Sequence, residues 1–394
     1  MIPRHIKQQL IKRYKFSRSI YIFGPRQSGK TTIARATFPD LPYVTLEDPD
    51  VLEYVKTDPR GFLEQFKTGA IIDEPQRYPD LFSYLQSEID IKKKKYILTS
   101  SQNFLTMESI SQSLAGRITI LNLMPLSKSE IDGESLKSPQ DFFNKKKSSV
   151  LSINSLWDKI LIGGYPEVVS NPEIYEYWYN DYVQTYIERD VRRIINVQDL
   201  STFQKFMKLC AGRTGSILNK ASLSNDAGIS EKSCTRWLSL LEQSGIIVLL
   251  KPYHNNFNKR QIKSPKLFFV DSGLCLYLLG IKNKQHIVTH PLLGSIVETY
   301  VFSEIYKNFL NNGLDTNFYY WRDQNGNEVD IVIDIDPTKS LAIEIKAGQT
   351  INHKMLSTLT KWSAIMNNAQ LILIYGGDQY QTRNGVNILP INTL

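Results

Sequence analysis

The stretch that decides the fold of the N-terminal region reads Ser19-Ile20-Tyr21-Ile22-Phe23-Gly24-Pro25-Arg26-Gln27-Ser28-Gly29-Lys30-Thr31-Thr32. Its first five residues predict a buried strand, and the next eight match the phosphate-binding pattern G-x-x-x-x-G-K-[ST] with a helical segment after it. Glycines in such a loop let backbone N–H groups surround phosphates at a helix N-terminus, while Lys30 reaches the β and γ phosphates and Thr31 binds magnesium. We therefore expect ATP and Mg²⁺ as cofactors. The predicted nucleotide contacts are Gly24, Pro25, Arg26, Gln27, Ser28, Gly29, Lys30, Thr31 and Thr32.

A second apolar run ends in two acids and reads Gly69-Ala70-Ile71-Ile72-Asp73-Glu74. This pattern indicates a buried strand of a parallel sheet, and it places Asp73 at the carboxyl edge of the sheet beside the phosphates. We expect Asp73 to hold the magnesium ion and Glu74 to orient or deprotonate the attacking water. Glu74 and Lys30 are thus the predicted catalytic residues of this region.

Three further strands complete the predicted sheet. Residues 96–102 form an apolar strand with a polar end, where Thr99 or Ser101 could sense the γ-phosphate or merely cap the strand. Ser101 is therefore added to the predicted nucleotide contacts. With Tyr43–Glu47 and Ile118–Leu123, five strands alternate with helical segments, which predicts a parallel α/β domain over residues 1–125.

The composition is that of a folded chain with more than one domain. The protein has 394 residues, of which 42% are hydrophobic and 22% charged, whereas disordered chains hold fewer apolar residues. No apolar run approaches the ~18 residues needed to span a bilayer, and the N-terminus has no signal-peptide core, so no membrane partner is expected. The three widely spaced cysteines offer neither a disulfide framework nor a zinc site, which predicts a cytoplasmic location.

The formal net charge of +8 is concentrated in two stretches without acids. Residues 1–18 contain six Lys and Arg residues and residues 251–266 contain five, while the rest of the chain is slightly acidic. A localised basic patch attracts a nucleic-acid backbone, although a solvated face is the alternative for either stretch.

Residues 126–216 have helical periodicity and are expected to form a helical lid next to the ATPase region. The run 174–179 is rich in aromatic side chains, which we expect in the core rather than on a ligand surface. A homo-oligomer is expected, in which one subunit could supply an arginine to its neighbour's ATP. Four residues remain open for this role: Arg117, Arg189, Arg192 and Arg193.

Residues 217–280 have the pattern of a winged helix-turn-helix. A short helix and a glycine turn over 221–230 precede a second helix, Glu231–Gln243, which Ser230 caps and Gly245 ends. Residues 246–250 and 266–270 form a predicted two-stranded wing, whose loop is the second basic stretch. Duplex DNA is the predicted partner, and packing against the ATPase region or another subunit is the alternative. The predicted DNA contacts are Lys232, Arg236, Lys259, Arg260 and Lys263.

Residues 281–394 are expected to form a restriction-endonuclease-like α/β domain. Two predicted strands over 319–322 and 329–333 flank an Asn-Gly turn signal. In the next strand, residues 341–346, alternation places Glu344 and Lys346 on one face.

This C-terminal region contains the residue types of a magnesium-dependent nuclease. Asp330 precedes Glu344 and Lys346 in the chain, and Glu298 lies on a predicted helix upstream. Carboxylates in such a constellation bind Mg²⁺, and the lysine positions water. Asp330, Glu344 and Lys346 are the predicted catalytic residues, and an inactive module that binds protein or nucleic acid is the alternative. The predicted metal ligands of both sites are Thr31, Asp73, Glu298, Asp330 and Glu344.

Several motifs together resemble those of a known prokaryotic group. They are Ile2-Pro3-Arg4, the phosphate-binding loop, Ile72-Asp73-Glu74-Pro75-Gln76, Ser113-Leu114-Ala115-Gly116-Arg117, Gly163-Gly164-Tyr165-Pro166-Glu167, Glu188-Arg189-Asp190-Val191, Cys210-Ala211-Gly212-Arg213-Thr214-Gly215 and Asn327-Glu328-Val329-Asp330. The chain resembles the AAA-type ATPases of bacteria and archaea that carry a C-terminal conserved domain of unassigned function, related to the STAND-like branch. This resemblance implies an ATPase core, a winged-helix middle and a nuclease-like end. One departure, Ser100 in place of an expected glycine, leaves the identity of the sensor residue open.

The sequence therefore predicts two alternative functions. In the first, the protein is an ATP-dependent DNA-processing enzyme. In the second, it is a nucleotide-dependent regulatory or assembly switch whose C-terminal domain is inactive.

Overall fold

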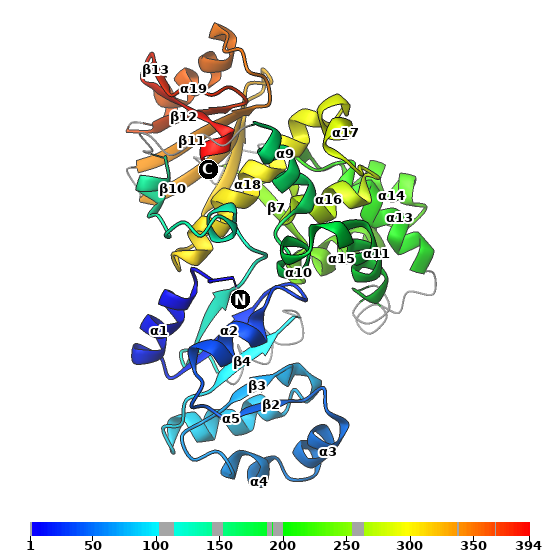
Figure 1. Ribbon diagram of the computed structural model, residues 1–394, viewed down its shortest axis with the longest axis vertical. Helices are drawn as coiled ribbons and strands as arrows, with labels where there is room; N and C mark the ends of the chain where they lie inside the picture. The colour runs from blue at the N-terminus through cyan, green and yellow to red at the C-terminus, as the bar shows by residue number, and fades with distance from the viewer. Residues whose placement is uncertain are drawn as a thin grey trace.

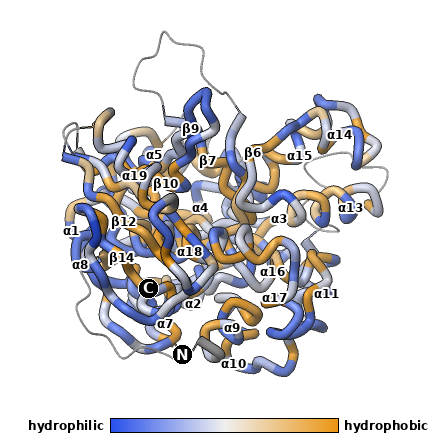
Figure 2. Tube along the Cα trace, turned by 90° about the horizontal axis from the view of Figure 1, so that it is seen from above, coloured by the Kyte–Doolittle hydropathy of each residue, from blue (hydrophilic) through white to orange (hydrophobic). Residues whose placement is uncertain are grey.

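The computed structural model describes residues 2–101, 114–143, 153–186, 191, 200–253, 264–336, 339–366 and 368–394. Figure 1 shows the N-terminal sheet and its helices at one end of the molecule and the C-terminal sheet at the other. The helices of residues 153–278 lie to one side of the C-terminal sheet, and α13 (Leu200–Ala211) and α14 (Lys220–Ala227) are at the edge of the molecule in both Figure 1 and Figure 2.

The N-terminal region is a five-stranded parallel sheet in the order β2-β3-β4-β1-β5, which confirms the predicted parallel α/β architecture. Its strands are β1 (Ser19–Phe23), β2 (Tyr43–Thr45), β3 (Ile71–Asp73), β4 (Ile97–Ser100) and β5 (Ile118–Asn122). The helices of this region are α1 (Lys7–Phe16), α2 (Lys30–Thr37), α3 (Pro49–Thr57), α4 (Pro59–Glu64), the 3-10 turn η1 (Pro75–Arg77) and α5 (Leu81–Asp90).

Strand alternation divides the apolar residues of this sheet between two cores. On β1, Tyr21 and Phe23 pack into one hydrophobic cluster, while Ile20 and Ile22 pack into another on the opposite face. Every residue of β1 is buried. A central parallel strand covered by helices on both faces has this pattern, and it fixes the position of the loop that follows Phe23.

The middle of the chain is mainly helical. Its elements are α7 (Lys128–Ile131), α8 (Pro139–Phe143), α9 (Ile153–Ile162), α10 (Pro166–Ser170), the turn η2 (Pro172–Ile174), α11 (Tyr175–Tyr186) and α13 (Leu200–Ala211). The aromatic run lies in α11, where Tyr175, Trp178 and Tyr179 are buried in one cluster and Tyr177 faces solvent. The prediction that these aromatic residues belong to the core is confirmed for the three buried ones.

Two helices and an antiparallel strand pair follow. After the short strand β6 (Ser216–Ile217) come α14 (Lys220–Ala227), a left-handed turn at Gly228, α15 (Glu231–Gln243), β7 (Ile247–Pro252), β8 (Lys266–Phe269) and α16 (Ser272–Leu278). Ser230 accepts a hydrogen bond from the backbone N–H of Ser233 and caps α15, as expected. The predicted pairing of β7 with β8 is confirmed, from Ile247 opposite Phe269 onward.

The strand pair is continuous with the C-terminal sheet. β7 pairs with β9, and a nine-stranded sheet runs in the order β13-β14-β12-β11-β10-β9-β7-β8-β6. This sheet crosses residue 280, where the sequence predicted a domain boundary. The remaining elements are α17 (Lys284–Thr289), α18 (Leu293–Asn311), β9 (Phe318–Arg322), β10 (Glu328–Asp336), β11 (Lys339–Lys346), α19 (His353–Ile365), β12 (Gln370–Tyr375), β13 (Gln381–Arg383), β14 (Val386–Pro390) and the turn η4 (Ile391–Thr393).

The C-terminal sheet has a core on both faces. Ile343 and Ile345 of β11 pack with α18, whereas Ala342 lies in a separate cluster with Trp362 of α19. The trace of β12 is predominantly hydrophobic in Figure 2. The β9–β10 hairpin is antiparallel, as expected. In the described ranges, no helix combines the length and apolar character that crossing a membrane requires.

Candidate functional site

The phosphate-binding loop connects the end of β1 to the start of α2. Gly24 follows the strand directly, and a Cβ atom added there would lie 1.9 Å from the carbonyl oxygen of Leu123, so only glycine fits. Gly29 caps α2, and its backbone is left-handed. Helix α2 then begins at Lys30, which points the free N–H groups of its first turn at the loop. The backbone therefore has the form that phosphates require.

The side chains of the loop are arranged around a buried lysine. Lys30 is buried, and its Nζ atom donates a hydrogen bond of 2.8 Å to the carbonyl oxygen of Pro25. Ser28 is fully buried, and its hydroxyl has no hydrogen-bond partner among the described atoms. Gln27 and Thr32 are exposed, and Arg26 is half-buried. A ligand with several acceptor oxygens would satisfy both Lys30 and Ser28.

Oxygen atoms converge next to the loop. The hydroxyl of Thr31 donates to a carboxylate oxygen of Asp73 at 3.1 Å, and the hydroxyl of Thr99 donates to the other oxygen. Tyr43 also donates to Asp73, at 3.2 Å. Hydroxyl and carboxylate oxygens are the ligands that Mg²⁺ prefers, so Thr31 and Asp73 fit this ion. Bound Mg²⁺ would neutralise charge on the phosphates.

Glu74, the predicted general base, directly follows Asp73 at the end of β3. Its backbone is left-handed (φ 55°), which is uncommon for a residue other than glycine and frequent at functional sites. Its carboxylate accepts hydrogen bonds from Gln76 and, at 3.2 Å, from Ser101. Burial raises the pKa of Glu74, an effect that the charge of Lys30 partly offsets. A carboxylate with a raised pKa is a better proton acceptor at neutral pH.

Arg4 holds the backbone of the loop, a role that the sequence reasoning did not assign. Its guanidinium donates to the carbonyl oxygens of Ser28 and Met124, each at 2.6 Å, and to the carboxylate of Glu130 at 3.1 Å. The Arg4 side chain is only 7% exposed. The interpretation of residues 1–18 as one surface patch was therefore wrong for this residue, because its charge is used inside the protein. The Ile2-Pro3-Arg4 motif was the available signal.

A second cluster of charged residues lies at the C-terminal sheet. Lys346 Nζ lies 2.5 Å from a carboxylate oxygen of Glu344 and 3.9 Å from Asp330. Asp330 also accepts a hydrogen bond of 2.8 Å from the backbone N–H of Ile345. The structure thus brings these three predicted residues together, with Glu298 of α18 reaching the same cluster through Lys266.

Lys266 of β8 lies at the centre of this cluster. Its ammonium group forms ion pairs with Glu298 at 2.8 Å, with Asp330 at 3.3 Å and with Glu328. Burial alone would lower the pKa of Lys266, but Asp330 and the two glutamates raise it well above its ordinary value. Burial and the charge of Asp330 raise the pKa of both Glu298 and Glu344.

The Lys266 ammonium pairs with two of the three carboxylates that were predicted to bind a metal here, Glu298 and Asp330, whereas Glu344 pairs with Lys346. The described side chains contain no group of three or more His, Cys, Asp or Glu residues placed to hold a metal ion. A Mg²⁺ ion bridging Glu298 and Asp330 does not fit this arrangement, because Lys266 already neutralises both carboxylates. The sequence reasoning counted Lys266 with the basic loop, whereas its side chain is 2% exposed.

The predicted DNA contacts are only partly described. Lys232 and Arg236 lie four residues apart on the exposed side of α15. Lys259, Arg260 and Lys263 lie outside the described residues. Among the arginines considered for a neighbouring subunit, Arg117 pairs with Asp90 of its own chain at 2.7 Å. Arg189, Arg192 and Arg193 are outside the described ranges.

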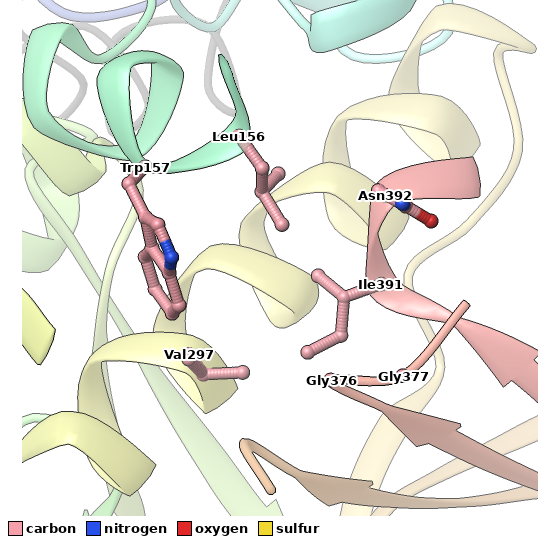
Figure 3. Close-up of a pocket in the computed structure, with 7 residues that line it drawn as sticks. All are labelled: Leu156, Trp157, Val297, Gly376, Gly377, Ile391 and Asn392. Carbon is pink, nitrogen blue, oxygen red and sulfur yellow. The ribbon is translucent and has the colours of Figure 1, made fainter. Parts of the chain in front are cut away.

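A small cavity between α9 and the C-terminal sheet is not a ligand site. Figure 3 shows Leu156 and Trp157 facing it from one side and Ile391 from the other. Its volume of about 10 Å³ is at most that of a single water molecule. The cavity therefore only marks where α9 packs against the sheet.

Three regions of the chain match family models. Residues 17–132 match an AAA domain, residues 153–285 match a domain of unknown function (DUF8612), and residues 293–394 match a second domain of unknown function (DUF4143). Together with the parallel sheet and the phosphate-binding loop, the first match defines the N-terminal region as an AAA-type P-loop ATPase domain. ATP binding and hydrolysis are the activities that this domain class supports.

Similar proteins occur in mycobacteria and archaea. The uncharacterized proteins Mb2031c of Mycobacterium bovis and Rv2008c of Mycobacterium tuberculosis are each 26% identical over 366 residues, which cover 91% of this chain and 76% of the relative. A Walker-type ATPase of Pyrococcus abyssi is 14% identical and covers 71% of this chain and 96% of its own, with a TM-score of 0.45. A STAND ATPase of Pyrococcus horikoshii with a tetratricopeptide repeat sensor is 15% identical and covers 79% of this chain and 47% of its own, with a TM-score of 0.28. Both TM-scores are below 0.5, so neither structure defines the domain arrangement of this protein.

Proposed function

We propose that the protein is an ATP-driven switch that binds duplex DNA in a nucleotide-dependent manner. The observation that carries this proposal is the joint placement of Thr31, Asp73 and Glu74 beside the phosphate-binding loop. In this proposal Lys30 binds the β and γ phosphates, Thr31 and Asp73 hold Mg²⁺, and Glu74 accepts a proton from the attacking water. Thr99 and Ser101 hold the two acids in position. Gly24, Pro25, Arg26, Gln27, Ser28, Gly29 and Thr32 complete the nucleotide contacts.

The ATPase region is in direct contact with the rest of the molecule. Gly245, in the turn after α15, lies against Pro25, and a Cβ added at Gly245 would be 3.1 Å from Pro25 Cδ. On another side, Glu304 of α18 accepts a hydrogen bond of 2.7 Å from the backbone N–H of Lys128. A change at the loop on nucleotide binding would move the Gly245 turn and α15. We infer that this contact transmits the nucleotide state.

Helix α15 is the element that we propose contacts DNA. The order of elements supports this proposal, because α14, a turn, α15 and an antiparallel strand pair follow one another as they do in a winged helix. Its buried side packs through Trp237 and Leu241, so Lys232 and Arg236 remain on the outer side, where they can reach phosphates. Lys259, Arg260 and Lys263, which follow β7 in the sequence, are proposed to add contacts.

An assembly switch without DNA is the second candidate function. The contact between Gly245 and Pro25 favours it equally, because movement of α15 could expose a surface for another subunit instead of DNA. In this case homo-oligomerisation responds to nucleotide, and the partner of α15 is protein.

ATP turnover measured with and without duplex DNA at low salt tests the proposal. We expect turnover in the wild type, faster turnover with DNA, and neither in Lys30→Ala. No turnover in the wild type overturns the ATPase assignment. If turnover occurs but DNA neither binds nor accelerates it, the DNA assignment fails. A change of oligomeric state with a non-hydrolysable ATP analogue then supports the assembly switch.

A further inference from the structure

The carboxylate cluster of the C-terminal sheet already contains a cation, which is part of the chain. Lys266 comes from β8, Glu298 from α18, and Glu328 and Asp330 from β10. The Lys266 side chain is 2% exposed, and Asp330 and Glu298 are 9% and 14% exposed. One lysine from β8 and three carboxylates from α18 and β10 therefore meet in a single, largely buried cluster.

The hydrogen-bonding capacity of Lys266 is fully used there. An ammonium group has three N–H donors, and three carboxylates surround this one. The second oxygen of Asp330 accepts a hydrogen bond from the backbone of Ile345. No donor of Lys266 remains for a phosphate, and both oxygens of Asp330 already have a partner within the protein.

A divalent cation and this ammonium group cannot share the cluster. Mg²⁺ binds oxygen at about 2.1 Å, and a bridge between Glu298 and Asp330 would bring it within a few Å of Lys266 Nζ. Two cations at such a separation repel strongly in a buried environment. Binding of the ion would require Lys266 to leave and its charge to be solvated elsewhere.

We propose that Lys266 is a built-in counter-ion that takes the place of a divalent metal in this cluster. The cluster consequently does not bind Mg²⁺ and does not cleave phosphodiesters. Instead, it fastens β8 to β10 and α18, and with them the strand pair that follows α15. This proposal does not depend on the ATPase or DNA assignments.

Manganese binding to nucleotide-free protein, followed by electron paramagnetic resonance, tests the proposal. Nucleotide is omitted because Mg²⁺ sites of this ATPase type are completed by phosphates. The wild type is expected to have no Mn²⁺ site that depends on Glu298 or Asp330, so its binding isotherm should equal those of Glu298→Gln and Asp330→Asn. A site of one ion per chain that either substitution removes overturns the proposal.

The Lys266→Met variant tests the same proposal by creating a site. It should gain one bound Mn²⁺ per chain that the wild type lacks, and the double variant with Glu298→Gln should lose this gain. The matched control is Lys307→Met, which removes another buried lysine, paired with Glu304 at 3.1 Å. This control should gain nothing. A folded Lys266→Met protein without a new site overturns the proposal, and if this variant does not fold, the wild-type comparison decides alone.

Discussion

Arg4 donates a hydrogen bond of 2.6 Å to the carbonyl oxygen of Ser28, in the middle of the phosphate-binding loop. The bond joins an N-terminal residue to the backbone of the loop. Because the guanidinium also bonds Met124 and Glu130, it fixes the loop relative to the end of β5 and to α7.

Replacing Arg4 should therefore weaken nucleotide binding. We expect Arg4→Ala to reduce ATP affinity about tenfold, or about 1.4 kcal/mol, as the loop loses its fixed backbone conformation. Arg4→Lys should recover little, because an ammonium group cannot reproduce the planar fork. Titration with a fluorescent ATP analogue measures the effect. Lys12→Ala, an exposed position on α1, is the control, and equal affinities for Arg4→Ala and this control would contradict the prediction.

The partner of Arg4 gives a prediction about acid stability. Burial raises the pKa of Glu130, but the charge of Arg4 and N–H groups of Ser127 and His5 outweigh it and lower the pKa overall. A carboxyl group whose pKa is lower in the folded state stabilises the protein at pH values above its ordinary pKa of about 4.3. This contribution to stability is lost as the pH falls through the folded-state pKa.

We expect Glu130→Gln to lose about 3 kcal/mol at neutral pH, since Arg4 is left buried without its counter-charge, and to flatten the acid limb of the stability profile. Urea unfolding at several pH values gives the required free energies. Glu53→Gln on the exposed side of α3 should behave as the wild type. A Glu130→Gln profile parallel to that of the wild type at low pH would show that this carboxylate is not the group responsible.

Substitution of Glu74 should separate hydrolysis from binding. Glu74→Gln keeps the shape, and its amide can accept from Gln76 and donate to the Ser101 hydroxyl, but the proton acceptor is removed. Turnover is expected to fall about 10²- to 10⁴-fold with ATP affinity nearly unchanged.

The pH dependence of turnover provides a second measurement on Glu74. Because burial raises its pKa, wild-type activity should increase as pH rises through this raised value, and the increase should be absent in Glu74→Gln. Glu47→Gln, a surface residue that pairs with Arg77, controls for the change of charge. Retention of the pH-dependent increase in Glu74→Gln would assign the base to another group.

The contact between Gly245 and Pro25 can be tested with a pair of glycines. Both Gly245 (φ +71°) and Gly280 (φ +73°) have left-handed backbones, but only Gly245 has neighbours within 4 Å of an added Cβ. Alanine at either position should cost about 1 kcal/mol of stability. Only Gly245→Ala should also change ATP affinity and the DNA response of turnover, as measured by ligand titration and ATPase assay. Identical ATPase behaviour of the two variants would mean that the contact transmits nothing.

Charge reversal on α15 tests the proposed DNA contact. Lys232→Glu/Arg236→Glu should weaken duplex binding and reduce the slope of log affinity against log salt by about 2, since each phosphate contact contributes about 0.9. Fluorescence anisotropy at several salt concentrations measures the slope. The double variant Lys56→Glu/Lys67→Glu changes net charge equally on the exposed surface of the ATPase domain. If both double variants have the same slope, α15 is not the DNA-binding element.

The sequence by itself determined the local parts of this protein. The parallel sheet could be predicted from three features of the sequence: the strand-loop-helix pattern of residues 19–32, the acids that end β3, and the apolar runs of the other strands. These features could be recognised because backbone periodicity and glycine positions are local properties of the chain. For the same reason the pairing of β7 with β8 and the Asn-Gly hairpin were predictable.

Only the tertiary structure decided which charges meet. Lys266 lies 64 residues before Asp330, and Arg4 lies 126 residues before Glu130, so no spacing rule connects either pair. Each lysine or arginine in a basic stretch looks equally solvated until packing buries some of them. Burial then selects partners, since a charge removed from water must be compensated by an opposite one. For this reason Arg4 and Lys266, which belong to the two basic stretches of the sequence, are buried. Arg4 stabilises the phosphate-binding loop, and Lys266 stabilises the carboxylate cluster.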